Sequence, residues 1–408
     1  MPRPPNRTLV FVLPWSLRPP PSGVEGQTAA MARRLASAGA RVEIWTTTAH
    51  PGEKEGDLNT RGFPAGDTIE DGLAVRRFLA APCDARAFER LQEKIRRGRC
   101  LEWPEESAYF RNGVWSEGMR RAIHNRRQEA LYLFAPAFAA TTVFGLPAAP
   151  QESVLLPFLR EEKQAGFRMV WETISACHHV LFNADPEGAA VQRLFDLEPK
   201  RCLAAAGIDY AEGEPPIESP LPPAVRKPYA LFLGRQGEEH GTAQLIEHFQ
   251  RLAGDSPLSF QLVLAGHGEA KAPPGRAGWI ASLGRVKEET KWALLANALC
   301  FVLPSTRETV SFSLLESWAA RRPAVVNAGG SVAAALARGS SGGLSYRTYA
   351  EFRHILETLA RNPELAEALG ERGNAYVRTH FRWSEAVDRL VRFLRDIEQW
   401  LAEGDLAA

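Results

Sequence analysis

The sequence has little cysteine, and what it has is scattered. Its 408 residues include five cysteines, which stand far apart and form no Cys-x-x-Cys pair. An odd number at such spacings argues against a disulfide framework and predicts buried free thiols in a reducing compartment. The five are Cys83, Cys100, Cys177, Cys202 and Cys300.

The chain also lacks an excess of charge of one sign and a long apolar run. Its 49 basic and 48 acidic residues give a formal net charge of +1, so no global attraction to nucleic acid is expected. No apolar run approaches the roughly 20 residues that span a bilayer. The first apolar run, residues 8–13, has no small-residue cleavage site after it and is interpreted as a strand, not a signal peptide. We therefore expect a cytoplasmic globular protein.

The length and the order of apolar segments predict two α/β domains. A chain of 408 residues exceeds the size at which single cores stop growing. A strand at 8–13, a glycine-bearing loop, a helix at 27–38 and a strand at 41–46 open one alternation, and another begins at 229–233. The Pro-rich segment 211–228 between them is typical of a linker. This organisation predicts Rossmann-like domains at 1–210 and 229–383.

The first half yields a further set of expected elements. His178 and His179 adjoin on one expected strand and face opposite ways, so a metal pair is not expected there. A polar loop is expected over 51–72, strands over 71–78, 131–134, 153–156 and 178–183, and helices over 85–99 and 114–130.

Two basic clusters lie on the expected helices of the first half, at residues 96–99 and 120–127. The favoured interpretation is a solvated helix face. The alternative is an acceptor-binding or membrane-surface patch. Nucleic acid is the least favoured partner, because neither aromatic interleaving nor a known binding module accompanies the charge.

In the second half, polar and glycine motifs follow successive apolar strands. Gly234 and Arg235 follow the strand at 229–233, and Pro304 and Ser305 follow a buried strand at 300–303. Similar motifs, at 266–269 and 284–285, follow the strands expected at 260–265 and 279–283. Carboxyl ends of parallel strands are where α/β folds bind ligands.

Two carboxylates, Glu308 and Glu316, stand on either side of a loop-to-helix junction with seven residues between them. Acidic residues are favoured near a helix N-terminus for structural reasons, and they could also accept from ligand hydroxyls beside an anion bound by the helix. Both interpretations are open on the residues alone.

Taken together, this order of motifs resembles the retaining glycosyltransferases of family 4 and their Glu-x7-Glu pattern. The resemblance covers residues 229 to about 383 and is thinner over the first half. It implies the GT-B fold, with two Rossmann-like domains facing each other across a donor-binding cleft. It further implies that the final amphipathic helix, about 384–408, packs back on the first domain.

The resemblance assigns roles on the donor. The donor is a nucleotide diphosphosugar, which needs cations and amides for phosphate and acceptors for hydroxyls. Glu308 would accept from the transferred sugar and Glu316 from the ribose. Backbone groups would contact the donor elsewhere, the diphosphate at the helix N-terminus and the base beside a strand end. They belong to Gly234, Arg285, Val286, Thr309, Val310, Ser311 and Phe312.

Four further residues complete the implied site, and two of them depart from the family pattern. Arg235 occupies the family's diphosphate position, and Gly23 matches a glycine that lets backbone approach the phosphates. His240 stands where the family has lysine, so one positive charge is conditional on protonation. Arg160 stands where related enzymes carry histidine beside the transferred sugar.

The implied activity is transfer of a sugar from a UDP- or GDP-sugar to a hydroxyl of a saccharide or lipid-linked saccharide, with retention of configuration. The sequence contains no Asp-x-Asp triplet, and we expect neither a metal nor another cofactor. Bacterial polysaccharide or glycoconjugate synthesis is the expected setting, in the cytoplasm with peripheral contact to the inner face of the membrane. Two alternatives are a donor-binding but catalytically weak regulatory subunit, and another two-Rossmann enzyme such as an epimerase or phosphorylase.

Overall fold

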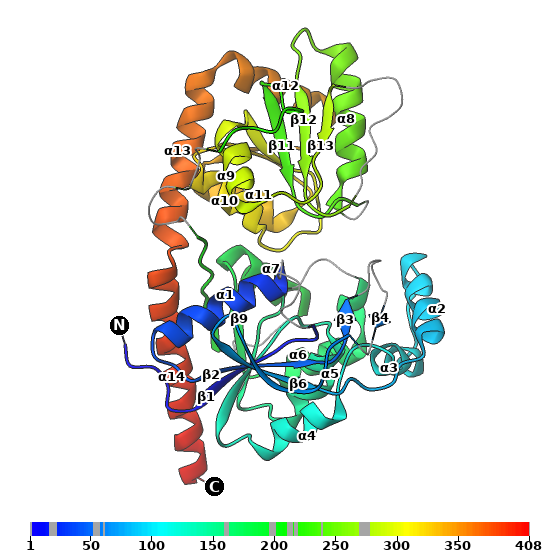
Figure 1. Ribbon diagram of the computed structural model, residues 1–408, viewed down its shortest axis with the longest axis vertical. Helices are drawn as coiled ribbons and strands as arrows, with labels where there is room; N and C mark the ends of the chain where they lie inside the picture. The colour runs from blue at the N-terminus through cyan, green and yellow to red at the C-terminus, as the bar shows by residue number, and fades with distance from the viewer. Residues whose placement is uncertain are drawn as a thin grey trace. The chain divides into compact units, whose positions relative to one another are not determined.

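A computed structural model shows two compact units, one formed by Met1–Ala205 with Ser384–Ala408 and the other by Ala206–Trp383. Each is a parallel-sheet α/β unit, which confirms the predicted fold class (Figure 1). The structure describes residues 2–15, 23–51, 58–59, 62–158, 163–195, 201–209, 215, 219–237, 240–268 and 278–407.

The first unit is built on an eight-stranded sheet with the order β10-β9-β8-β7-β1-β2-β6-β5. Every pairing is parallel except that of the edge strand β5 with β6. Fully buried strands such as β1 and β7 suit a sheet covered on both faces. The strands are β1 (Thr8–Val12), β2 (Val42–Thr47), β5 (Gly66–Glu70), β6 (Leu73–Phe78), β7 (Ala130–Phe134), β8 (Ser153–Leu155), β9 (His179–Phe182) and β10 (Arg201–Ala204), with a separate antiparallel pair β3 (His50–Pro51) and β4 (Leu58–Asn59).

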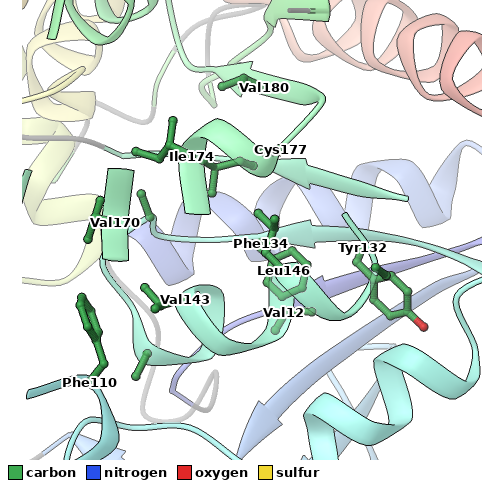
Figure 2. Close-up of a cluster of buried hydrophobic side chains, with 14 of the residues drawn as sticks. Val12, Phe110, Tyr132, Phe134, Val143, Leu146, Val170, Ile174, Cys177 and Val180 are labelled. Atoms are coloured by element: carbon green, nitrogen blue, oxygen red, sulfur yellow. The ribbon is translucent and has the colours of Figure 1, made fainter. Parts of the chain in front are cut away.

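Helices cover this sheet, and one face of it carries a large apolar core. Side chains of the central strands meet those of the helices α4 to α6 there. The helices are α1 (Val24–Ser37), α2 (Ala85–Arg96), α3 (Trp103–Arg111), α4 (Glu117–Asn125), α5 (Ala140–Gly145), α6 (Arg168–Ala176), α7 (Asp185–Phe195) and α14 (Trp383–Ala407), with 3-10 turns at Leu146–Ala148 and Lys163–Gly166. Figure 2 shows part of this core, including Val12, Phe110, Tyr132, Phe134, Val143, Leu146, Val170, Ile174, Cys177 and Val180.

Three expected elements of the first half are wrong in extent. The segment expected as a loop over 51–72 contains β5, an exposed edge strand whose alternation is too polar to be recognised. The helix expected over 85–99 ends at Arg96, because Gly98 adopts a left-handed conformation with φ 78°. The helix expected over 114–130 is the shorter α4, which begins after the N-cap Ser116. The helix α3 was not expected.

The cysteines are free, but the expectation that all are buried is wrong. Cys177 and Cys300 are buried, Cys83 is half-buried, and Cys100 and Cys202 are exposed. The exposed pair is explained by position, because Cys202 lies on the edge strand β10 and Cys100 follows the turn that ends α2.

The long helix α14 packs on the first unit. The carboxylate of Glu398 accepts hydrogen bonds from the backbone N–H groups of Asn6 at 3.0 Å and Arg7 at 2.7 Å. The Trp400 ring lies 5.2 Å from that of His179, which is buried, whereas His178 is exposed. Among the helices as far as they are described, none is long and apolar enough to cross a membrane.

The basic clusters are largely paired within their own helices. Glu93 lies 3.0 Å from Arg96 and 2.7 Å from Arg97, and Glu117 binds Arg120 at 2.7 Å. Such exposed pairs are worth little stability individually, but they cancel local charge. The arrangement agrees with the interpretation as a solvated helix face.

The second unit has a six-stranded, wholly parallel sheet with the order β13-β12-β11-β14-β15-β16. Numbered along the unit, this is the order 3-2-1-4-5-6 of dinucleotide-binding folds. Its strands are β11 (Tyr229–Leu233), β12 (Gln261–Ala265), β13 (Ile280–Ser282), β14 (Cys300–Leu303), β15 (Ala324–Asn327) and β16 (Gly343–Tyr346). Its helices are α8 (Thr242–Asp255), α9 (Glu288–Asn297), α10 (Phe312–Ala319), α11 (Ser331–Ser340), α12 (Tyr349–Arg361) and α13 (Pro363–His380).

The two helices that matter most for the site, α9 and α10, are each anchored by a buried tryptophan. Trp292 and Trp318 are 1% and 0% exposed. The indole N–H of Trp318 donates to the Gly342 carbonyl at 2.8 Å, and the amide of Asn374 donates to the Trp318 carbonyl at 3.1 Å. These contacts hold the orientation of α10 against α13 and the end of α11.

Candidate functional site

The predicted site residues of the second unit gather where the strand order reverses. Strand β11 lies between β12 and β14, so the loops after β11 and β14 leave the sheet edge in opposite directions. Open α/β sheets bind ligands in the crevice at this switch point, outside the carboxyl ends of the strands. Gly234 and Arg235 follow β11, and Glu308 lies in the loop after β14.

Glycines allow the loops on one side of the switch point to run unusually close together. Gly266 has φ 135°, and a Cβ added there would overlap the carbonyl oxygen of Gly234. The backbone N–H of Gln236 donates to the His267 carbonyl at 2.7 Å, and that of Gly266 donates to the Gly284 carbonyl at 2.8 Å. Backbone hydrogen bonds therefore link the segments that follow β11, β12 and β13.

A side-chain bond joins the two loops that flank the switch point. The His240 Nδ1 lies 2.9 Å from the Glu308 Oε1, although 68 positions separate the two residues. Their side chains are 9% and 19% exposed. The adjoining Gly241, with φ 74°, brings this turn against Pro304, whose carbonyl would lie 3.0 Å from an added Cβ. The structure thus brings together two predicted site residues from opposite sides of the crevice.

The loop after β14 delivers the N-terminus of α10 to the same edge. Ser311 caps the helix, its hydroxyl accepting from the Leu314 N–H at 3.3 Å. Thr309 and Val310 are buried, and Phe312 is half-buried as the first helical residue. The first backbone N–H groups of a helix lack intrahelical acceptors and favour an anion.

Glu316 lies one turn into α10 and forms an ion pair that the sequence did not suggest. The Lys291 ammonium of α9 lies 2.7 Å from the Glu316 Oε1 and 2.6 Å from the Glu288 Oε1. Burial raises the pKa of Glu316, and Lys291 opposes that rise. Burial alone would lower the pKa of Lys291, but Glu316 and Glu288 outweigh it and raise the pKa. A regular i, i+3 spacing links Lys291 to Glu288, yet no local pattern points to Glu316.

The predicted arginines of this unit are exposed at the same sheet edge. Arg235 follows β11 by two residues and Arg285 follows β13 by three, with Val286 half-buried beside Arg285. Two exposed guanidinium groups, helix amides and two carboxylates supply both kinds of group that a sugar diphosphate needs. Within the described part of the chain, no group of three or more His, Cys, Asp and Glu side chains could hold a metal ion.

Two predicted site residues belong to the first unit. Gly23 is the N-cap of α1 with φ 64°, and a Cβ added there would meet open space. Arg160 lies outside the described residues, so its predicted role stays a prediction.

Comparison with known proteins bears on the sequence pattern of the second unit and on the fold of the chain. Residues 217–376 match the family model of Glycosyl transferases group 1. Sucrose-phosphate synthase from Thermosynechococcus elongatus superposes with a TM-score of 0.68 at 16% identity, covering 96% of this chain and 99% of that one. HepE from Anabaena, in complex with UDP and glucose, has a TM-score of 0.64 at 13% identity, covering 96% and 100%.

A third structure, of an E. coli trehalose-6-phosphate protein bound with UDP-2-fluoro glucose, has a TM-score of 0.68 at 10% identity and covers 95% and 98% of the two chains. At these identities the likeness establishes the fold. The chain therefore has the GT-B fold of glycosyltransferases, and its second unit carries the sequence pattern of Glycosyl transferases group 1.

Proposed function

We propose that the protein transfers a sugar from a nucleotide diphosphosugar to an acceptor hydroxyl with retention of configuration. The donor is a UDP- or GDP-sugar, and the acceptor is a saccharide or a lipid-linked saccharide. UDP ranks first because the similar structures from Anabaena and E. coli hold UDP or a UDP-sugar. The proposal includes no metal ion and no other cofactor.

The observation that most supports this proposal is the arrangement of Glu308 and Glu316 around the N-terminus of α10, at the switch point of a 3-2-1-4-5-6 sheet. A carboxylate in the loop and another one turn into the helix bracket backbone amides that suit a diphosphate. Arg235, exposed after β11, adds a fixed positive charge on the opposite side. Hydroxyl acceptors on both sides of an anion site match a sugar and a ribose joined by diphosphate.

The proposed reaction breaks the bond between the anomeric carbon and the diphosphate oxygen. The acceptor oxygen forms the new bond to that carbon on the same face. Its proton passes to an oxygen of the departing phosphate, and the nucleoside diphosphate leaves. Arg235 and protonated His240 stabilise the negative charge on the leaving group, so catalysis depends on positioning and electrostatics.

A second candidate is a donor-binding subunit with weakened chemistry. The observation that favours it is His240 itself, because its imidazole is bonded to Glu308 and carries a charge only when protonated. A lysine at this position would be charged throughout the physiological range.

A nucleotide panel followed by a turnover assay tests both candidates. Ligands that bind only the folded state raise its melting temperature, so UDP, GDP and their sugars can be ranked by thermal shift. Release of UDP or GDP from the best donor, with and without acceptor extracts, then separates the two. Binding without release would favour the subunit, and the absence of binding by any nucleotide would refute both.

The setting of the reaction is also part of the proposal. We place it in bacterial polysaccharide or glycoconjugate synthesis in the cytoplasm, with the helices α2 and α4 contacting the inner membrane face. Sedimentation with anionic vesicles tests that contact. Loss of sedimentation on substituting Arg96 and Arg121 by glutamine would support it, and failure of the intact protein to sediment with the vesicles would contradict it.

A further inference from the structure

We propose that Lys291 is a positioning residue of the donor site, which holds Glu316 ionised and aimed at the ribose hydroxyls. This inference rests on the proposed function, because it concerns how that donor is bound. Lys291 lies on α9, outside every motif that pointed to the site.

The geometry brings one ammonium group against two carboxylates. The Lys291 Nζ lies 2.7 Å from the Glu316 Oε1 and 2.6 Å from the Glu288 Oε1. The side chains of Lys291 and Glu316 are 19% and 21% exposed, whereas Glu288 is 58% exposed. Of the two pairs that Lys291 forms, the more enclosed is therefore the one that includes the proposed ribose acceptor.

The charge environment makes Glu316 dependent on its partner. Burial raises the pKa of Glu316, and the neighbouring acids Glu288 and Asp209 raise it further. Lys291 opposes this shift through its charge and its hydrogen bond. Removing Lys291 would leave the carboxyl among acidic neighbours in a desolvated site, where the neutral form is favoured.

Ribose binding needs the ionised form. Two adjacent hydroxyls that both donate require two acceptor oxygens, which only a carboxylate offers in full. The Glu316 Oε1 already accepts from Lys291 and keeps a second lone pair, and within the described part of the chain no hydrogen bond occupies Oε2. The ion pair is therefore compatible with a bound ribose.

The pair is also held in place from both helices. Trp292, next to Lys291, is buried and donates its indole N–H to Glu288 at 2.9 Å. Trp318, two residues after Glu316, is buried and bonded to Gly342. Because both helices are anchored, the Lys291 ammonium restrains the direction of the Glu316 carboxylate.

The experiment compares UDP with 2′,3′-dideoxy-UDP by titration calorimetry (or the GDP pair, if the nucleotide panel favours GDP). The ratio of the two Kd values isolates the ribose hydroxyls, because both ligands carry the same base and diphosphate. Two charge-assisted hydrogen bonds predict that the Kd of 2′,3′-dideoxy-UDP exceeds that of UDP by a ratio of about 10 or more in the unmodified protein. In Lys291→Met the ratio should fall to within about threefold of 1, and in Lys291→Arg it should stay near the original value.

The dependence on pH provides a readout that structural damage would not produce. In Lys291→Met the ratio should recover as pH rises, because Glu316 then ionises without its partner. Lys94→Met is the matched control, since Lys94 pairs with Glu105 at 2.7 Å in the first unit. It should leave the ratio unchanged. Lys291→Gln serves if the methionine variant does not fold.

The outcomes separate this inference from the function on which it rests. If the unmodified protein binds neither nucleotide, the proposed function fails. If it binds UDP and Glu316→Ala reduces the ratio to about 1, while Lys291→Met retains the full ratio, only the role of Lys291 is refuted.

Discussion

The conditional charge of His240 leads to a specific prediction about pH. The imidazole bridges the crevice to Glu308 at 2.9 Å, and a neighbouring carboxylate favours the protonated ring. A diphosphate favours the same form, so donor binding should take up a proton. UDP affinity should therefore decrease as pH rises and the His240 ring loses its charge.

The expected size of the change in the UDP Kd follows from the burial of His240 and Glu308. Both side chains are less than a fifth exposed, so the charge is only partly screened by solvent. A hydrogen bond to a charged group contributes about 1.5–3 kcal/mol, which corresponds to roughly 10- to 100-fold in Kd. A single linked proton can change the affinity by at most about tenfold per pH unit. We expect the UDP Kd to rise at least tenfold between pH 6 and pH 8.

Titration calorimetry with UDP over this range measures the effect, and two variants isolate its source. His240→Lys should bind with nearly constant affinity across the range, because ammonium stays charged. His240→Ala should bind weakly at every pH and leave the Glu308 carboxylate facing the anion. A pH profile of His240→Lys as steep as that of the original protein would refute the reasoning.

Three further predictions concern other parts of the chain. Burial raises the pKa of Glu187 to about 7, so its proton stabilises the folded state at low pH, and this stabilisation is lost as pH rises from about 5 to 7. In Glu187→Gln, the free energy of unfolding measured in urea should decrease by up to about 3 kcal/mol less over this pH range. A variant with the same pH dependence as the original protein would contradict this prediction. Gly266→Ala should destabilise by about 2–4 kcal/mol through overlap with the Gly234 carbonyl, whereas Gly254→Ala, in a helix with open space, should be neutral or stabilising. Arg235→Ala should lower kcat for nucleotide release by about 10²- to 10³-fold, and an effect on KM alone would argue against leaving-group stabilisation.

The local sequence pattern predicted the secondary structure best where strands are buried and where glycine or proline marks the turns. The apolar runs that became β11, β12 and β14 were expected within a residue or two, because parallel strands covered on both faces are apolar throughout. The edge strand β5 escaped recognition, since an exposed strand carries no such signal. The predicted ends of helices in the first half were also wrong, because a cap such as Ser116 is defined by its backbone and hydrogen-bond geometry, which the apolar pattern does not show.

For the site, the positions of the motifs after strand ends were enough to place Arg235, Glu308 and Glu316 at one sheet edge. Parallel connectivity alone brings such residues together. What the amino-acid sequence determined by itself is thus the fold class and the sheet edge at which these motifs gather.

Only the tertiary structure decided which side chains pair. The bond between His240 and Glu308 crosses 68 positions, and that between Lys291 and Glu316 crosses 25. No periodicity relates such partners, because their contact depends on strand order and on how α9 packs against α10. Packing also determines how far burial shifts the pKa of Glu316 and how strongly a partner must oppose that shift.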